Sequence, residues 1–354
     1  MHDGLKRQRK RSMSRFRGHH SPPTRRRTTV KFAIALAAAL ILVVGGYLVG
    51  EWLENRSYQE ERQQMSENFG LLPTMEYQGQ TYMRRPEVTT MLLMGVDQHM
   101  DEEPTGSRHG GRADFLLLMA LDHKNQKVYQ LQIDRDTFTE VPVVGVLGNE
   151  VGTRAMQICL AYNYGNNNEE RCRHTVQAVQ MLLNDEPIEL ALAVKLDGIA
   201  VLNQALGGIR VTIPEDMTVV DPAFTAGATL TLTDAQTEKL VRARMTVGDG
   251  LNVSRMRRQR TFLEAATRQL RSMLASDSDF AGRLFDSLEA ISSYTNVTRG
   301  RLINEANRAY NYDIQPVDTL AAEYKIGAQE LMECHVDKDA VTAWLIKTLY
   351  EPKN

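Results

Sequence analysis

Three short apolar runs constrain the fold of this chain more than any other feature. They cover residues 91–96, 115–121 and 128–133, and polar or charged residues bound each of them. Continuous apolar runs of this length, bounded by turn signals, are typical of buried β-strands. In an open α/β sheet, functional loops gather where the strands end. The sequence therefore predicts a largely buried sheet with a candidate site along one edge.

Charged side chains stand at the ends of these runs and are, in chain order, Asp97, Arg112, Asp114, Asp134, Arg135 and Asp136. Acidic and basic groups at neighbouring strand ends could form a single site. Taken singly, each aspartate also fits an ordinary turn residue with a surface ion pair, because Asp is frequent in turns. The residues alone leave both interpretations open.

The start of the chain is strongly basic and is followed by an uncharged run. Residues 1–31 contain eleven Lys and Arg and one acid, and residues 32–50 contain no charged side chain. As a helix this run is ~28 Å long, enough to cross a bilayer. The charges predict a cytoplasmic tail, one transmembrane helix and an extracytoplasmic body at the cell membrane. The alternative, a cleaved signal peptide, has a shorter apolar run, and residues 47–52 are a poor cleavage site.

The basic tail also resembles a nucleic-acid-binding patch. A membrane anchor directly behind it explains the same charges, so we expect no nucleic-acid partner. Residues 51–87 are polar and contain two prolines that break regular structure, which predicts a stalk. Residues 88–354 are expected to form one α/β domain in which helices cover the sheet.

Beyond the three apolar runs, the pattern predicts further strands and helices. Strands are expected at 189–196 and 209–213, with a helix at 199–206 between them, which implies a right-handed crossover. Residues 141–170 are glycine-rich and are expected to be irregular. Helices are also expected at 173–184, 233–244, 261–274 (opened by 255–260), 279–293, 298–310 and 338–349.

Two arginine clusters follow later in the chain. Arg242 and Arg244 end the helix predicted at 233–244, and residues 255–260 hold four more arginines. Carboxylates bind Mg²⁺ together with substrate phosphates. Each arginine can bind two phosphate oxygens in a bidentate arrangement. This combination indicates phosphoryl transfer, and no GxxxxGK[ST], GxSxG, HExxH or CxxC pattern indicates another chemistry. On charge alone, the second cluster fits a solvated helix face equally well.

A series of segments in one order resembles the LytR–CpsA–Psr family. They span roughly residues 88–270 and are MLLMGVDQ, GRADFLLLMALD, LQIDRDTFTEVP, QICLAYNYG, LNQALGGIRVTI, LVRAR and GDGLNVSRMRRQRTFL. The resemblance implies an α/β/α sandwich with a mixed central sheet and an apolar pocket for a polyprenyl chain. It implies a phosphotransferase that moves an anionic glycopolymer, such as wall teichoic acid or capsule, from an undecaprenyl-pyrophosphate carrier to peptidoglycan, with Mg²⁺ or Mn²⁺ as cofactor.

The resemblance also assigns roles to residues. Asp97 and Asp114 match the family's metal-binding aspartates, and Arg135 with Asp136 matches its arginine–aspartate pair. Arg242 and Arg244 match the paired arginines that are expected to act in catalysis. The side chains expected to bind the pyrophosphate are Arg112, Arg135, Arg242, Arg244, Arg255 and Gln259.

Two positions depart from the family pattern. Asp134 replaces the usual proline before the arginine–aspartate pair. The acid that often lies three residues before Arg255 is Asn252 here, and Asp249 lies three residues further back. Asp136 and Asp249 therefore both stay open as the acceptor of the substrate's proton, with family precedent favouring Asp249.

Two other functions fit the same residues. One is hydrolysis of the polyprenyl pyrophosphate, with water as the acceptor. The other is a membrane-anchored lipid-binding or regulatory protein without enzymatic activity, since some members were named as transcriptional attenuators. Activity with and without a glycan acceptor would discriminate among the three.

Three cysteines are expected to face an oxidising compartment. Cys159 and Cys172 flank a loop at 164–168 whose glycine and asparagines permit a tight reversal. A disulfide between them would fasten this loop to the following helix and leave Cys334 single. The alternative is that all three cysteines are reduced.

Overall fold

The computed structural model describes residues 72–353 except for 100–105, 245–246 and 249–250. The predicted tail, the transmembrane helix at 32–50 and most of the stalk lie outside the described residues. Within the described part of the chain, no helix is both long and apolar enough to cross a membrane.

Six strands form a central mixed sheet in the order β11-β8-β3-β4-β5-β12. β3 pairs with β8 and β5 with β12 in parallel, whereas β4 lies antiparallel between β3 and β5. A mixed α/β fold with a mixed central sheet is therefore confirmed. The bounds are β3 (Val88–Val96), β4 (Ala113–Asp122), β5 (Lys127–Ile133), β8 (Leu190–Lys195), β11 (Ser292–Thr295) and β12 (Asp313–Asp318).

The register brings the ends of the three predicted strands to one edge, here called the site edge. Val96 at the end of β3 pairs with Ala113 at the start of β4, and Leu116 pairs with Ile133 at the end of β5. Lys195 ends β8 opposite Val96, at the same level. The loops after β3, β5 and β8 therefore all leave the sheet at the site edge, as expected from the apolar runs.

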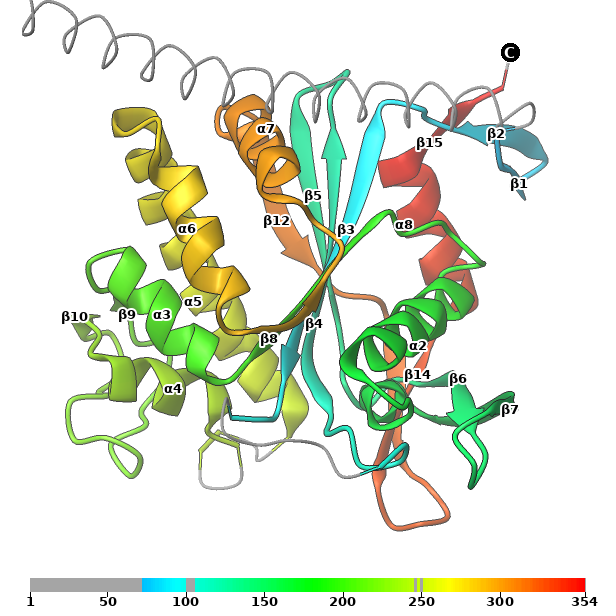
Figure 1. The fold of residues 1–354 in the computed structure, drawn as a ribbon, viewed down its shortest axis with the longest axis horizontal. Coiled ribbons are helices and arrows are strands. Elements are labelled where there is room, and N and C mark those ends of the chain that lie inside the picture. Colours follow the sequence, from blue (N-terminus) through cyan, green and yellow to red (C-terminus); the bar gives the residue numbers. More distant parts are fainter. Residues whose placement is uncertain (1–71, 100–105, 245–246, 249–250, 354) are drawn as a thin grey trace, which may run out of the picture. The chain divides into compact units, whose positions relative to one another are not determined.

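Helices α2 (Asn168–Leu182) and α8 (Lys338–Leu349) cover one face of the sheet (Figure 1). Alternate residues of the strands point to this face because the side-chain period of a strand is two. Leu92, Leu118 and Leu131 are fully buried there in one apolar cluster with residues of both helices. This cluster is the main core, and it fixes the level of the strand ends that carry the site.

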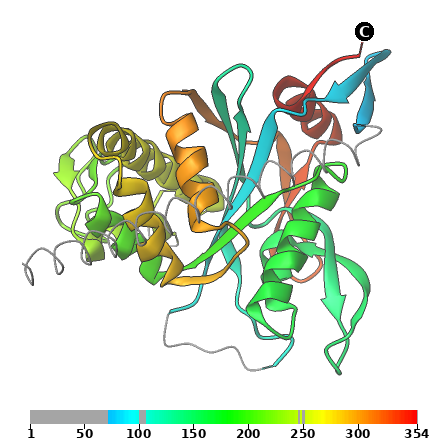
Figure 2. The same cartoon turned by 45° about the horizontal axis from the view of Figure 1, so that its top comes forward.

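The helices α3 to α7 lie on the other side of the sheet, as Figures 1 and 2 both show. An apolar cluster on this side includes Leu240, Phe262 and Leu284 and the short β9–β10 hairpin, but no residue of the central sheet. The elements are α3 (Asp197–Ala205), β9 (Arg210–Thr212), β10 (Thr229–Thr231), α4 (Asp234–Arg242), α5 (Asn252–Ser276), α6 (Phe280–Glu289) and α7 (Arg299–Ala309).

The sheet face toward these helices is apolar but incompletely covered. Met91, Leu93, Phe115 and Met119 point to this face, because they alternate with residues of the main core. All four are only partly buried, and none belongs to either apolar cluster. Apolar side chains in the middle of a sheet are normally buried, so this face has surface available for an apolar ligand.

Smaller β-units complete the described fold. β1 and β2 lie within the segment expected as a stalk, where β1 pairs with β2 and β2 pairs with β15. Two hairpins, β6–β7 and β13–β14, lie near the site edge, and β14 forms a bridge from Cys334 to Thr137. The bounds are β1 (Thr74–Tyr77), β2 (Gln80–Arg84), β6 (Phe138–Val144), β7 (Glu150–Gln157), η1 (Ile158–Asn163), β13 (Ala322–Ile326), β14 (Met332–Val336) and β15 (Tyr350–Pro352).

Two expectations about local structure were wrong. β9 does not join the central sheet by a crossover but pairs antiparallel with β10, because its buried side chains belong to the helical cluster. Residues 141–170 are not irregular, since β6 and β7 form a hairpin there. By contrast, the capping box of Thr233 and Gln236 at the start of α4 is present as predicted.

Candidate active site

The structure brings most of the predicted site residues together at the site edge. Asp97 follows β3, Arg112 and Asp114 flank the start of β4, and residues 135–136 follow β5. Two arginines arrive from the end of α4 and its following loop, and one from the first turn of α5: Arg242, Arg244 and Arg255. Segments far apart in sequence thus supply one cluster of charge.

Asp114 lies at the centre of this cluster. Its Oδ1 is 2.5 Å from Nη1 of Arg135, and its Oδ2 is 3.5 Å from Nη1 of Arg255. Nε of Arg112 is 3.9 Å from the same carboxylate. Leu116 and Ile133 are the terminal pair of β4 and β5, and Asp114 and Arg135 each lie two residues beyond it at the same end of the two strands.

Asp97 forms the outer part of the cluster. Arg112 donates to its Oδ2 at 3.0 Å, and Arg242 donates to its Oδ1 at 3.3 Å. Both arginines are about half exposed, with relative side-chain areas of 47% and 45%. These two guanidinium groups can therefore turn from the carboxylate to a ligand with little loss of buried contact.

Asp136 forms the inner part of the cluster and is almost fully buried. Its carboxylate lies 3.2 Å from Nε of Arg135 and 3.4 Å from Nη2 of Arg244, and it accepts a hydrogen bond from Gln157. Burial and then the charge of Asp134 raise the pKa of Asp136, although the nearby arginines act in the opposite direction. A carboxyl with a raised pKa is a better proton acceptor than an ordinary aspartate.

Arginine outnumbers carboxylate in this cluster. Asp97, Asp114 and Asp136 face five guanidinium groups. Nε of Arg244 is buried without a hydrogen-bond partner. A buried donor without a partner is unfavourable, and an anion with several oxygens would satisfy it. The arrangement is therefore suited to a multiply charged anion.

Asp97 and Asp114 are the residues that could hold a metal ion. They supply oxygen ligands from adjacent strand ends, and each side chain is about one quarter exposed. Mg²⁺ is commonly held by one or two carboxylates, with waters and substrate phosphates completing its shell. Among the described residues, no group of three or more His, Cys, Asp or Glu could hold a metal. The donor set fits an ion shared with a phosphate ligand.

Two further predicted site residues are Gln259 and Asp249. Gln259 lies on α5, where its amide accepts a hydrogen bond from Gln132 at 2.9 Å and donates to the backbone of Val241 at 3.3 Å. These two hydrogen bonds connect β5 with the end of α4. Asp249, the proton acceptor favoured by family precedent, lies outside the described residues.

The predicted disulfide between Cys159 and Cys172 is absent, and all three cysteines of the chain are free and buried. The two side chains have different surroundings. Cys159 lies among the site charges, and its backbone N–H donates to the carbonyl of Arg135. Cys172 lies in an apolar environment, where burial raises the pKa of its thiol to about 12. The loop between them is closed by hydrogen bonds instead, such as that of Asn166 with Glu170.

Sequence reasoning did not assign three polar residues that contact the cluster. Gln157 donates to Asp136, Asn252 accepts from Arg255, and Tyr324 donates to Asp134. Only Asn252 carried a signal, because it stands where an acid is usual. Gln157 and Tyr324 lie in hairpins without a recognisable motif, so only the tertiary structure brings them to the site.

Comparisons with known proteins identify the family and its relatives. The LytR_cpsA_psr family matches residues 53–346. A curated relative, the polyisoprenyl-teichoic acid–peptidoglycan teichoic acid transferase TagU of Halalkalibacterium halodurans, is 29% identical over 200 residues. The matched segment covers 56% of this chain and 58% of the relative, so this chain spans less than two thirds of that protein.

Solved structures share the fold at lower identity. Protein gbs0355 from Streptococcus agalactiae superposes with a TM-score of 0.60 at 19% identity, covering 74% of this chain and 86% of its own. A structure described as TagT bound to LI-WTA gives a TM-score of 0.56 at 17% identity, covering 74% and 91%. Since the family match extends over most of the chain, this protein belongs to the LytR–CpsA–Psr family.

Proposed function

We propose that this protein is a phosphotransferase that moves an anionic glycopolymer from a polyprenyl-pyrophosphate carrier to peptidoglycan. The observation that carries this proposal is the surplus of arginine around Asp97, Asp114 and Asp136 at the site edge. The partly covered apolar face of the sheet, which starts at Phe115 beside Asp114, supports a lipid-linked substrate. The names of the TagU and TagT proteins described above support teichoic acid and peptidoglycan as substrate and acceptor.

The arginines would act on charge that changes during the reaction. A pyrophosphate diester carries two negative charges, and a third accumulates on the lipid phosphate as it leaves. Arg135 and Arg244 flank the buried carboxylate of Asp136 and are best placed to stabilise this charge. Arg112, Arg242 and Arg255 would hold the remaining phosphate oxygens.

The acceptor hydroxyl must lose a proton as it attacks the phosphorus. Asp136 is a candidate acceptor, because its pKa is raised and it lies between Arg135 and Arg244. Asp249 is the second candidate. A comparison of Asp136→Asn with Asp249→Asn decides between them. The rate should rise with pH as the proton acceptor ionises, and only the variant that removes this acceptor should lose that rise.

We further propose that Asp97 and Asp114 hold one Mg²⁺, or Mn²⁺ in its place, against the pyrophosphate. A bound divalent ion would neutralise charge on the phosphate oxygens. Asp97→Ala should raise the Mg²⁺ concentration needed for half-maximal turnover by roughly tenfold or more, as the loss of a ligand to a metal does. Unchanged Mg²⁺ dependence in both Asp97→Ala and Asp114→Ala would refute the metal assignment.

The deciding experiment is an assay with the purified full chain, lipid-linked pyrophosphate substrate and Mg²⁺. A phosphodiester product that forms only with a glycan acceptor supports the transferase. Equal release of lipid phosphate without acceptor indicates a hydrolase instead. Absence of both products, combined with binding of the lipid substrate, indicates a non-enzymatic lipid-binding or regulatory protein.

The proposed substrate requires a location at the membrane. We propose a single-pass protein with residues 1–31 in the cytoplasm, 32–50 in the membrane and the body outside. External protease should then remove the body from intact cells and leave a protected N-terminal fragment. A body that is protected in intact cells would contradict this topology.

A further inference from the structure

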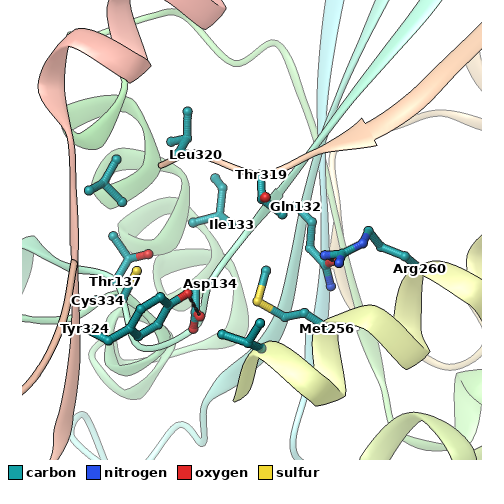
Figure 3. A pocket seen from close by; sticks show the side chains of 12 residues that line it. Gln132, Ile133, Asp134, Thr137, Met256, Arg260, Thr319, Leu320, Tyr324 and Cys334 are labelled. Atoms are coloured by element: carbon teal, nitrogen blue, oxygen red, sulfur yellow. Dashed lines mark hydrogen bonds between the residues drawn. The ribbon is translucent and has the colours of Figure 1, made fainter. Parts of the chain in front are cut away.

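A chain of polar contacts connects the β13–β14 hairpin with the arginine cluster, and it is buried except at its outer end, where Tyr324 is 40% exposed. Tyr324 of β13 donates to Oδ2 of Asp134 at 2.9 Å, and Figure 3 shows its ring directed at this carboxylate. Nδ2 of Asn252 donates to Oδ1 of Asp134 at 2.6 Å. Oδ1 of Asn252 in turn accepts from Nε of Arg255 at 2.9 Å and also from its Nη2.

Both carboxylate oxygens of Asp134 accept hydrogen bonds. Its Oδ1 accepts from Asn252 and from the backbone N–H of Asp136, and its Oδ2 accepts from Tyr324. The residue is 6% exposed and makes none of the arginine ion pairs of the cluster. A buried carboxylate whose two oxygens are both engaged holds its neighbours in a fixed arrangement.

The side-chain amide of Asn252 has a defined orientation because of Asp134. A carboxylate can only accept, so it requires the NH₂ group of Asn252. The amide oxygen is then directed at Arg255, where it receives two donors of the guanidinium group. The third nitrogen, Nη1, is left to face Asp114 at 3.5 Å. The rotation of Arg255 is therefore set by Asp134.

We propose that Asp134 is a positioning residue for the anion site, that it acts through Asn252 on Arg255, and that Tyr324 makes the β13–β14 hairpin part of this device. The proposal rests on the proposed function, since it assumes that Arg255 binds a phosphate group. A cavity of about 80 Å³ borders Asp134 and Tyr324, so these side chains have room to shift when a contact is lost (Figure 3). The hairpin contact is thus needed to keep the carboxylate in place.

The test measures binding of inorganic pyrophosphate to the full chain in detergent, in the presence of Mg²⁺, by calorimetry. Asp134→Ala should weaken binding roughly tenfold and Tyr324→Phe roughly threefold, in line with the loss of hydrogen bonds to a charged group. Matched controls are Asp122→Ala and Tyr350→Phe, which remove a buried carboxylate and a buried Tyr–carboxylate hydrogen bond at the other end of the strands. The controls should lower the melting temperature without changing pyrophosphate affinity.

An exchange of the two side chains separates positioning from general destabilisation. Asn252→Asp alone sets two carboxylates face to face, whereas Asp134→Asn alone still offers an amide oxygen to the NH₂ group of Asn252. Asp134→Asn combined with Asn252→Asp restores a donor opposite an acceptor and keeps an oxygen directed at Arg255. The double variant should therefore bind pyrophosphate more tightly than Asn252→Asp alone.

Each outcome is informative. Wild-type affinity in Asp134→Ala, or a double variant that binds no more tightly than Asn252→Asp alone, would overturn the positioning role while leaving the proposed function intact. A wild-type chain that binds no pyrophosphate would overturn the proposed function, and the inference with it.

Discussion

The two ends of the central strands both carry buried arginines, but they use them differently. At the end opposite the site edge, Arg84 pairs with Glu186 at 2.6 Å, and Arg85 pairs with Asp122. Tyr350 adds a hydrogen bond to Glu186 at 2.8 Å. Here the two acids are fully buried and each pairs with one buried arginine, whereas at the site edge five arginines share Asp97, Asp114 and Asp136, and two of the five, Arg112 and Arg242, are about half exposed.

The two charged clusters should therefore differ in whether they stabilise the fold or bind a ligand. Balanced charges at the opposite end hold β2, α8 and β15 against the sheet, so their removal should affect folding. Unbalanced charges at the site edge leave part of the guanidinium surface available, so their removal should affect ligand binding and turnover.

Glu186→Ala should lower the free energy of unfolding by about 3 kcal/mol or more, because it leaves Arg84 buried without its main partner. Urea unfolding measures this effect, and turnover per folded molecule should be unchanged. Glu351→Ala is the control, since its ion pair with Lys124 is exposed and contributes little. A Glu186 variant that stays stable but loses turnover would break the contrast.

Arg135→Ala and Arg244→Ala should each reduce turnover by about 10²-fold or more, in line with the loss of a preorganised charge stabiliser. Steady-state kinetics with the lipid-linked substrate provides the measurement. Arg85→Ala, which removes a buried arginine from the opposite end, serves as the matched comparison. Equal losses of turnover in all three variants would show that the two ends do not differ in role.

The pKa values of two buried aspartates should be shifted in opposite directions. Burial alone would raise the pKa of Asp122, but hydrogen bonds from Asn125 and the charge of Arg85 lower it overall. Burial and Asp134 raise the pKa of Asp136. Carboxyl carbon chemical shifts should therefore place Asp122 below and Asp136 above the ordinary aspartate value of about 3.9.

The directions of these two pKa shifts also determine how the stability of the fold depends on pH. Ionised Asp122 stabilises the fold above pH ~3.9, and this contribution is lost as pH falls through its lowered pKa. For Asp136 the favoured form is the protonated one, so its contribution is present below pH ~3.9 and is lost as pH rises through its raised pKa. Asp122→Asn should therefore destabilise at neutral pH, whereas Asp136→Asn should not. The same sign of change in both variants would contradict the assigned shifts.

Arg257→Ala should change turnover by less than about twofold, the smallest effect expected, because a surface ion pair contributes little. Its guanidinium is 54% exposed and contacts Glu215, away from the site carboxylates. Arg255→Ala, two residues earlier on α5, is the matched variant and should be far more damaging. Similar losses in both would mean that α5 presents a different face to the ligand.

The parts of the fold that the sequence predicted depend on local signals. The apolar runs that became β3, β4 and β5 are continuous, and Thr233 with Gln236 forms a capping box within four residues. The β6–β7 hairpin was missed because β7 is exposed along most of its length and lacks the alternation of a half-buried strand. The crossover to β9 was expected from element order alone. β9 has only three residues, and so short a segment does not indicate which strand it pairs with.

The candidate site shows the same limit. Residues next to the apolar runs, such as Asp97, Asp114 and Arg135, could be assigned from their position at strand ends. Tyr324 reaches Asp134 across 190 positions of sequence, and no local pattern encodes that contact. The disulfide was expected from spacing along the chain, whereas the direction of each thiol depends on how η1 and α2 pack.

The pairing of β2 with β15 has a consequence for folding during synthesis. Tyr350 and Pro352 pair with Arg84 and Tyr82, so β2 waits for a strand that is made much later in translation. Until residues 350–352 have emerged from the ribosome, this edge of β2 stays open, and an open strand edge can pair with other chains. A nascent chain is therefore exposed to mispairing along β2 for as long as β15 is missing.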